Sequence, residues 1–220
     1  MQTFDTPTPI SAVLDIPAGH VRLIAADRAD TAVEVRPADA AKNRDVKVAA
    51  RTTVEYGDGV LRVENTAKNQ ILGASGSIEV TVQLPAGSRV EAKAASAELR
   101  GVGRLGDVAF DGVHGSIKLD EAASVRLTTQ AGDVTVGRLT GPAEISTGKG
   151  DIRIAEAARG AVVLRTQAGD VSVGAAAGVS AALDAGTTLG RITNTLRNTG
   201  DTDLTIHATT AIGDIAAHGN

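Results

Sequence analysis

The sequence predicts an all-β protein built as a parallel β-solenoid, also called a β-helix, and three observations lead to this prediction. The phrase TTQAGDVTVG at 128–137 returns as RTQAGDVSVG at 165–174, with STGKGDIRIA at 146–155 between them. Apolar residues alternate within each copy as in a β-strand, and the copies recur every 18–20 residues or so, which is typical of solenoid rungs. Only three of the 220 residues are aromatic, so aliphatic side chains and threonine must fill the core, which suits flat, stacked sheets.

Residues 1–88 are predicted to form antiparallel, hairpin-rich β-structure that covers the first rung. RTTVEYGDGVLRVE (51–64) carries Asp58-Gly59 between two alternating runs, a strong hairpin signal. Two more strands, TAVEVRP (31–37) and SIEVTVQLP (77–85), flank polar loops at 37–45 and 64–77, and no amphipathic helix longer than two turns is expected. Because IPAGHVRLIA (16–25) and LPAGSRVEAKA (84–94) echo the repeated phrase, we expect one continuous domain with a soft boundary near residue 88.

Residues 89–220 are predicted to form the solenoid repeats, each turning at a glycine that an aspartate usually follows. Glycine supplies the unusual backbone angles of a corner, and the aspartate can accept hydrogen bonds from turn amides that lack strand partners. The predicted corner residues are Gly115, Gly132, Asp133, Gly150, Asp151, Gly169, Asp170, Gly190, Gly213 and Asp214.

Alternate residues on either side of the corner are predicted to stack in core columns about 4.8 Å apart, like residue upon like residue. Leu127, Ile145 and Leu164 form the column before the corner, and Val134, Ile152 and Val171 form the column after it. The preceding rung supplies Phe110 and Ile117. If the last two rungs carry two extra turn residues, Leu183 and Ile206 extend the first column, and Ile192 and Ile215 extend the second.

These stretches resemble the β-strand-repeat "putative adhesin" family of bacteria, a domain of unknown function common in actinobacteria. The resemblance rests on IPAGHVRLIA, on LPAGSRVEAKAAS (84–96) and on the three corner phrases, and it covers most of the chain. The early rungs depart from the Gly-Asp pattern, with Ala97-Glu98 and Gly115-Ser116. The family carries no established catalytic residue, so the resemblance implies the fold and a role in binding.

Charge and composition exclude several classes of function. The net charge of −4, with both signs interspersed, offers no footprint for nucleic acid or an anionic membrane, and the absence of cysteine excludes disulfides and thiolate metal sites. We expect no membrane span, because the longest apolar run, at 173–183, is too short. The opening MQTFDTPTP lacks the basic and apolar regions of a signal peptide, so we expect a cytoplasmic location, or the cell surface if a leader was removed.

Three motifs suggest chemistry, and each has a structural explanation. The corner aspartates could bind a cation, but Arg191 interrupts their series and the GGxGxD signature of calcium-binding repeats is missing. GVGRLG at 101–106 matches the dinucleotide-binding pattern, although strand-like sequence follows it where a helix is needed. The histidines, His20, His114, His207 and His218, are scattered. We therefore predict no catalytic, cofactor-binding or metal-binding residue, and no cofactor.

The sequence therefore predicts a non-enzymatic scaffold or binding protein that recognises an unknown protein or glycan partner by its surface. One alternative is a self-assembling element that stacks end to end, because the C-terminal rung TDLTIHATTAIGDIAAHGN (202–220) is expected to expose an unpaired edge with Leu204, Ile206, Ile212 and Ile215. The other alternative is a carbohydrate-active β-helix enzyme. Its charges would come from outward residues that lack aromatic sugar platforms beside them, namely Lys118, Asp120, Arg126, Glu144 and Arg153.

Overall fold

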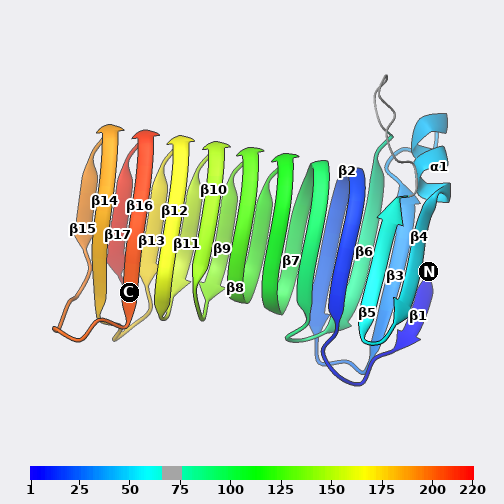
Figure 1. Ribbon diagram of the computed structural model, residues 1–220, viewed down its shortest axis with the longest axis horizontal. Coiled ribbons are helices and arrows are strands. Elements are labelled where there is room, and N and C mark those ends of the chain that lie inside the picture. Colours follow the sequence, from blue (N-terminus) through cyan, green and yellow to red (C-terminus); the bar gives the residue numbers. More distant parts are fainter. Residues whose placement is uncertain (66–75) are drawn as a thin grey trace.

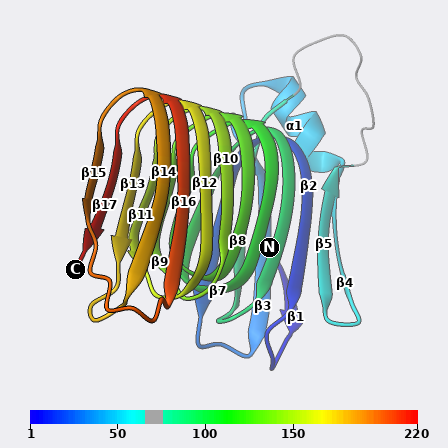
Figure 2. The ribbon, with the colours of Figure 1, turned by 60° about the vertical axis from the view of Figure 1, so that its left-hand side comes forward.

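The computed structural model describes residues 1–65 and 76–220, which form a stack of flattened coils (Figures 1 and 2). Each coil contributes one strand to sheet A and one to sheet B. Sheet A contains β4 (Thr52–Gly57), β5 (Val60–Asn65), β10 (Ala143–Lys149), β12 (Gly160–Ala168), β14 (Ala181–Leu189) and β16 (Leu204–Ile212). Sheet B contains β1 (Gln2–Asp5), β3 (Asp30–Pro37), β6 (Ile78–Pro85), β9 (Val134–Leu139), β11 (Ile152–Ala157), β13 (Val171–Ala175), β15 (Ile192–Thr195) and β17 (Ile215–Gly219).

Three long strands pass from one sheet to the other around the corners. They are β2 (Ser11–Ala26), β7 (Arg89–His114) and β8 (Ile117–Ala131), and the 26 residues of β7 make more than one full coil. Successive rungs run parallel, with Leu127, Ile145 and Leu164 side by side in sheet A and Val134, Ile152 and Val171 side by side in sheet B. All six side chains are buried between the sheets. The predicted all-β parallel solenoid is confirmed.

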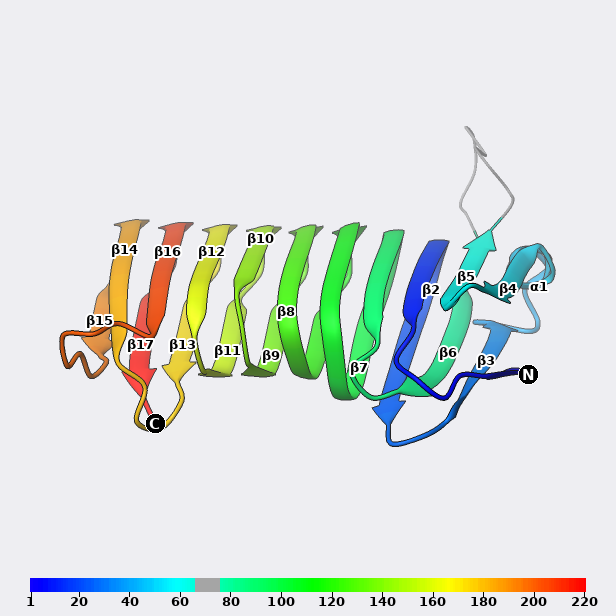
Figure 3. The same ribbon diagram turned by 60° about the horizontal axis from the view of Figure 1, so that its bottom comes forward.

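The last two rungs stack in reverse order of the sequence. In sheet A, β16 lies between β12 and β14, and in sheet B, β17 lies between β13 and β15, all of them parallel (Figure 3). The expectation that residues 202–220 expose the free edge is therefore wrong. Leu204, Ile206 and Ile215 are buried inside the stack, and β14 and β15 form its end.

The predicted core columns need one correction at this end of the stack. Leu164 aligns with Ala208 and Ala185, whereas Ile206 and Leu183 align with Val162. The expected extra residues do not lie in the turns, because every corner keeps the same number of residues from its glycine. They lie in the connections 176–180 and 196–203, and the second of these carries the chain back past the terminal rung. Ile192 and Ile215 do align with Val171, as predicted.

The N-terminal part also contains a displaced rung. β2 lies parallel to β7 on one side and parallel to β5 and β6 on the other, so the antiparallel assignment of residues 1–88 is wrong for 11–26. This segment carries the IPAGH corner phrase and the same alternation as the later rungs, and it packs as one of them. The predicted hairpin of β4 and β5 is confirmed, and its turn residues Asp58 and Gly59 both have positive φ.

Two features cover the N-terminal end. Strands β3 and β1 continue sheet B in antiparallel fashion, and Phe4 of β1 meets Tyr56 of β4 with ring centroids 5.4 Å apart, closing the space between the sheets. A helix, α1 (Asn43–Ala50), begins near the end of the loop expected at 37–45 and continues beyond it. Its buried Asp45 accepts a hydrogen bond from the Ser77 amide. Most of the loop predicted at 64–77 lies outside the described residues.

Candidate interaction surface

The corner between the sheets is built from glycines stacked on glycines. A Cβ added to Gly132, Gly150 or Gly169 would lie 2.1–2.3 Å from the carbonyl oxygen of the corner residue one rung before it, which is far closer than atoms tolerate. The same holds for Gly213 on Gly169 and for Gly190 on Gly213. The glycine is therefore required because neighbouring backbones touch, and the positive φ of these residues adds to that requirement.

The corner aspartates form a ladder of hydrogen bonds along the same edge. The Asp133 carboxylate accepts from the Asp151 amide at 2.9 Å, Asp151 from Asp170 at 2.9 Å, and Asp170 from Asp214 at 2.8 Å. Asp214 then accepts from the Arg191 amide at 2.8 Å. In spatial order Arg191 does not interrupt the ladder but ends it, because no further rung follows to offer an amide.

Threonines give the corner a second set of hydrogen bonds, which the sequence analysis did not assign. The hydroxyls of Thr147, Thr166 and Thr210 donate to the corner glycine carbonyls of the rung before, at 3.0–3.3 Å. In the terminal rung Thr187 donates likewise to the Gly213 carbonyl at 3.0 Å. The sequence does show a threonine three residues before the corner glycine in each of these rungs, and this column could have indicated the hydrogen bonds.

The residues considered for metal binding or catalysis are spread over the molecule. Within residues 1–65 and 76–220, no three His, Asp or Glu side chains are grouped to hold a metal ion. Arg126 and Glu144 lie on sheet A, whereas Lys118, Asp120 and Arg153 lie on sheet B, so the structure does not bring these charges together.

The histidines also lie apart. His20 pairs with Glu98 at 3.5 Å on sheet B, and His207 pairs with Asp184 at 3.2 Å on sheet A.

The glycine-rich segment 101–106, which matches the dinucleotide-binding pattern, belongs to strand β7, and the strand continues to His114 where that pattern needs a helix.

Two carboxyl groups have shifted pKa values, and both lie near the N-terminal end of the stack. Hydrogen bonds from the Arg28 guanidinium, at 3.0 and 2.9 Å, lower the pKa of Asp30 from its usual 3.8. A hydrogen bond from the Ala41 amide, with a further one from Lys42, lowers the pKa of Asp39. Both groups are structural and lie away from the hollows of sheet A.

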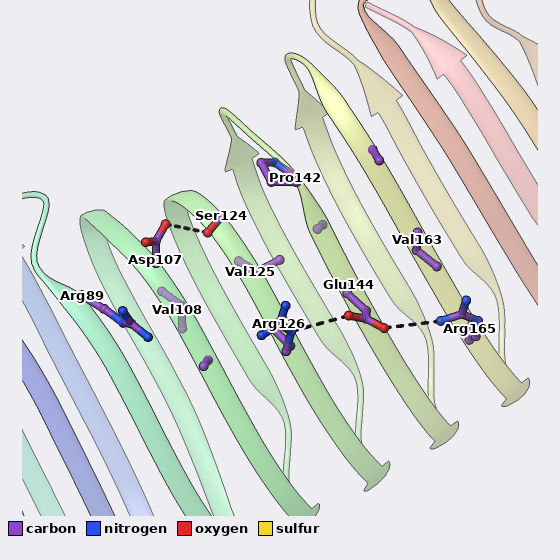
Figure 4. A pocket seen from close by; sticks show the side chains of 13 residues that line it. Arg89, Asp107, Val108, Ser124, Val125, Arg126, Pro142, Glu144, Val163 and Arg165 are labelled. Carbon is purple, nitrogen blue, oxygen red and sulfur yellow. Dashed lines mark hydrogen bonds and ion pairs between the residues drawn. The ribbon is translucent and has the colours of Figure 1, made fainter.

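The outer face of sheet A carries a shallow hollow of about 460 Å³ across five rungs (Figure 4). Glu144 lies between two arginines, with 3.5 Å from its carboxylate to Arg126 Nε and 3.7 Å to Arg165 Nη1. At the next position along the strands, the Ser124 hydroxyl donates to Asp107 at 2.6 Å, and Arg89 lines the side towards β2. Three more hollows lie along the stack on this face.

The strand register places these side chains in rows. Arg126, Glu144 and Val163 occupy one outward column, and Thr128, Ser146 and Arg165 the next, so Glu144 meets Arg126 directly and Arg165 diagonally. All three charged side chains are more than half exposed, so each ion pair contributes less than about 1 kcal/mol to stability. With three arginines and two acids, the hollow is positive in a chain whose net charge is −4.

None of the three aromatic side chains is available at this face. Phe110 is 3% exposed and points into the core, and Phe4 and Tyr56 contact each other at the N-terminal end. The surface can form ion pairs and hydrogen bonds but provides no ring on which a sugar could stack.

Comparisons with known proteins agree with this architecture. A family model described as Toastrack DUF4097 matches residues 13–219. The chain belongs to the Toastrack family. The family resemblance inferred from the sequence is confirmed, and this is a family of unknown function without known catalytic activity.

Solved structures are similar to this Toastrack protein at low sequence identity. A "putative adhesin" from Bacteroides fragilis matches with a TM-score of 0.58 and 13% identity, over 98% of this chain and 95% of that one. A "putative adhesin" from Parabacteroides distasonis has a TM-score of 0.47, 14% identity and coverages of 98% and 95%. A "putative cell adhesion protein" from Clostridium sporogenes has a TM-score of 0.42, 12% identity and coverages of 100% and 98%. None of the curated proteins compared with the chain matches it.

The helix content of the described residues has one implication for membranes. No helix within residues 1–65 and 76–220 has the length and apolar character needed to cross a bilayer.

Proposed function

We propose that this Toastrack protein is a non-enzymatic binding scaffold that recognises a protein partner through the outer face of sheet A. The observation that carries the proposal is the group of three charges Arg126, Glu144 and Arg165 in the hollow of that face. Exposed ion pairs stabilise the fold little, so three charges brought together by adjacent rungs, two in register and one diagonal, are better explained by recognition than by stability.

A protein is favoured over a glycan by the chemistry of the face. Carbohydrate sites commonly use aromatic rings as platforms. Here Phe110 is buried, and Phe4 and Tyr56 lie at the N-terminal end of the stack, outside the hollow. A flat polar surface with excess arginine suits an acidic, extended protein surface, because arginine binds carboxylates through paired hydrogen bonds. The expected location in the cytoplasm stays a prediction.

A matched pair of charge-reversed variants tests the proposal. Glu144→Lys combined with Arg165→Glu alters the hollow, whereas Arg138→Glu combined with Glu156→Lys alters an exposed ion pair of 3.6 Å on sheet B. Each immobilised protein is exposed to extract from the cells that produce it, and bound proteins are identified by mass spectrometry. We expect at least one protein that the wild type and the sheet B variant retain and the sheet A variant loses.

The same three proteins are applied to a glycan array. Glycan binding that only the sheet A variant loses would replace the protein partner with a carbohydrate. Partners retained equally by both variants would contradict a role for this face.

A further inference from the structure

The end of the stack formed by β14 and β15 differs from every interior rung. Ile206 and Ile215, in the rung beside it, are at most 1% exposed, whereas Ile192, in the same column as Ile215, is 44% exposed. Leu183 and Ala185 of β14 are also only partly buried, although their neighbours in register, Ile206 and Ala208, are fully buried. The terminal rung therefore leaves part of its apolar interior open.

The backbone of β14 is unpaired over most of its outer edge. β14 pairs with β16 on one side only. On the other side the Ala181 amide donates to the Arg197 carbonyl at 2.9 Å, so the connection 196–203 covers the first residue of the edge. By the alternation of a strand, the N–H groups of Leu183, Ala185 and Thr187 point the same way, and none of the described residues pairs with them.

We propose that this end face binds a second copy of the chain, forming a two-fold dimer in which β14 pairs antiparallel with β14 of the other copy. The charges at the free edge are self-complementary. Asp184, whose side chain is 81% exposed, lies in the first half of β14, and the exposed Arg191 lies at the corner that follows β14. A two-fold axis that crosses the chain midway between these two residues places each Asp184 beside the Arg191 of the other copy, so the contact forms twice per dimer.

The opposite end of the stack favours a closed dimer over a growing fibre. Its outermost strands are β1, of four residues, and β4, of six, and both run antiparallel to their neighbours. These edges differ in length and charge from the nine-residue β14. Head-to-tail stacking would have to join unlike edges, whereas the two-fold arrangement joins like with like.

The size of the face sets the expected strength of the dimer. A register that places Asp184 beside the other copy's Arg191 centres the two-fold axis near Thr187, so only the second half of β14, about 20 Å of strand at about 3.3 Å per residue, faces its counterpart. With packed sheets about 10 Å apart and their side chains, the contact measures roughly 350–400 Å² per copy, or about 700–800 Å² in total, the size of a weak, transient interface. The dimer should therefore depend strongly on concentration, with a Kd of about 100 µM or above.

Sedimentation velocity from about 1 µM to about 500 µM tests the proposal. We expect the wild type to pass from monomer to dimer and to stop there. Ala185→Pro removes an outward N–H that makes no bond within the chain, and proline is tolerated at such edge positions, so this variant should remain monomeric with its circular dichroism spectrum unchanged.

Charge variants of Arg191 and Asp184 test the dimer independently of Ala185→Pro, which could unfold the protein. Arg191→Glu leaves the backbone bond to Asp214 in place and should raise the Kd at least about tenfold, because the changed contact occurs twice. Asp184→Arg combined with Arg191→Asp should restore dimerisation, with Asp27→Arg, at an almost fully exposed side chain in the N-terminal part, as a control away from the edge. A wild type that stays monomeric, a mass that keeps growing with concentration, or a dimer unaffected by either charge variant would overturn the proposal.

Discussion

The replacement Gly150→Ala tests the stacking of rungs at the corner. The added Cβ would lie 2.3 Å from the Gly132 carbonyl oxygen and 2.6 Å from its carbonyl carbon, at a φ of +143°. To reach an ordinary contact, the two rungs must separate by about 1 Å at this edge. The corner hydrogen bonds that join these two rungs, from the Gly132 amide to the Lys149 carbonyl at 2.9 Å and from the Val134 amide to the Asp151 carbonyl at 2.8 Å, would lengthen.

The size of the effect follows from these contacts. Loss of two such hydrogen bonds removes about 2 kcal/mol, and a non-glycine residue at this backbone angle adds about 1–3 kcal/mol of strain. We expect the free energy of unfolding to fall by about 3–5 kcal/mol, and the melting temperature by roughly 10–15 °C for a chain of this length.

Thermal and urea unfolding followed by circular dichroism measures this change. Gly186→Ala is the matched control, because Gly186 lies in a solenoid strand, has an ordinary φ and has no atom within 4 Å of the added Cβ. It should be neutral or stabilising by up to about 1 kcal/mol. If Gly150→Ala lowers stability by less than about 1 kcal/mol, or if both variants behave alike, then backbone contact does not explain the corner glycines.

Three further predictions test the core, the corner ladder and the N-terminal strands. Leu164→Asp places a charge at a fully buried position and should unfold or aggregate the protein. Arg165→Asp, on the outer face, should change the free energy of unfolding by less than about 1 kcal/mol. Similar melting curves for the two variants would show that the inward face is wrongly assigned. Asp151→Ala removes the acceptor of the Asp170 amide and should cost about 1 kcal/mol in urea titrations, while Asp151→Asn, which keeps an oxygen, should cost less; equal losses would argue against the ladder. Because the pKa of Asp30 is lowered in the folded state, its contribution is present above pH 3.8 and lost as the pH falls further. Asp30→Asn should therefore be less stable than the wild type at pH 7 and equally stable well below pH 3.8; a difference that persists in acid would contradict this origin.

The repeated rung could be predicted from the sequence because the same columns recur in every copy. Leu127, Ile145 and Leu164 occupy equivalent places between equivalent corners, and parallel stacking is the arrangement that buries them together. The order of the last two rungs could not be predicted in this way. Both present the same alternation, so the pattern fits either order. Arg191 was the one residue that indicated the order. Only the terminal corner of the ladder needs no carboxylate, because no further rung offers it an amide, and Arg191 is the corner residue without one.

The candidate surface was predictable only in part. Arg126 and Glu144 could be recognised as outward charges because they follow the alternation of their strands. The contact of Glu144 with Arg165 is diagonal, because Arg165 lies two residues beyond Val163, the direct neighbour of Glu144 in the next rung. Such a contact depends on the conformations of two long side chains. Helix α1 was missed because it is two turns long and is stabilised by the tertiary contact between Asp45 and Ser77.

The reversed order of the last two rungs determines which edge is exposed and which residues are buried, and paired cysteines test it directly. The chain contains no cysteine of its own. Val163 and His207 are neighbours in register, whereas Asp184 lies beyond His207, two rungs from Val163. Adjacent rungs are about 4.8 Å apart and can be joined by a disulfide, whereas a gap of about 9.6 Å is too wide. At micromolar concentration and under mild oxidation, Val163→Cys with His207→Cys should form an intramolecular disulfide, and Val163→Cys with Asp184→Cys should keep both thiols free. A disulfide in the second variant and free thiols in the first would show that the rungs stack in the order of the sequence.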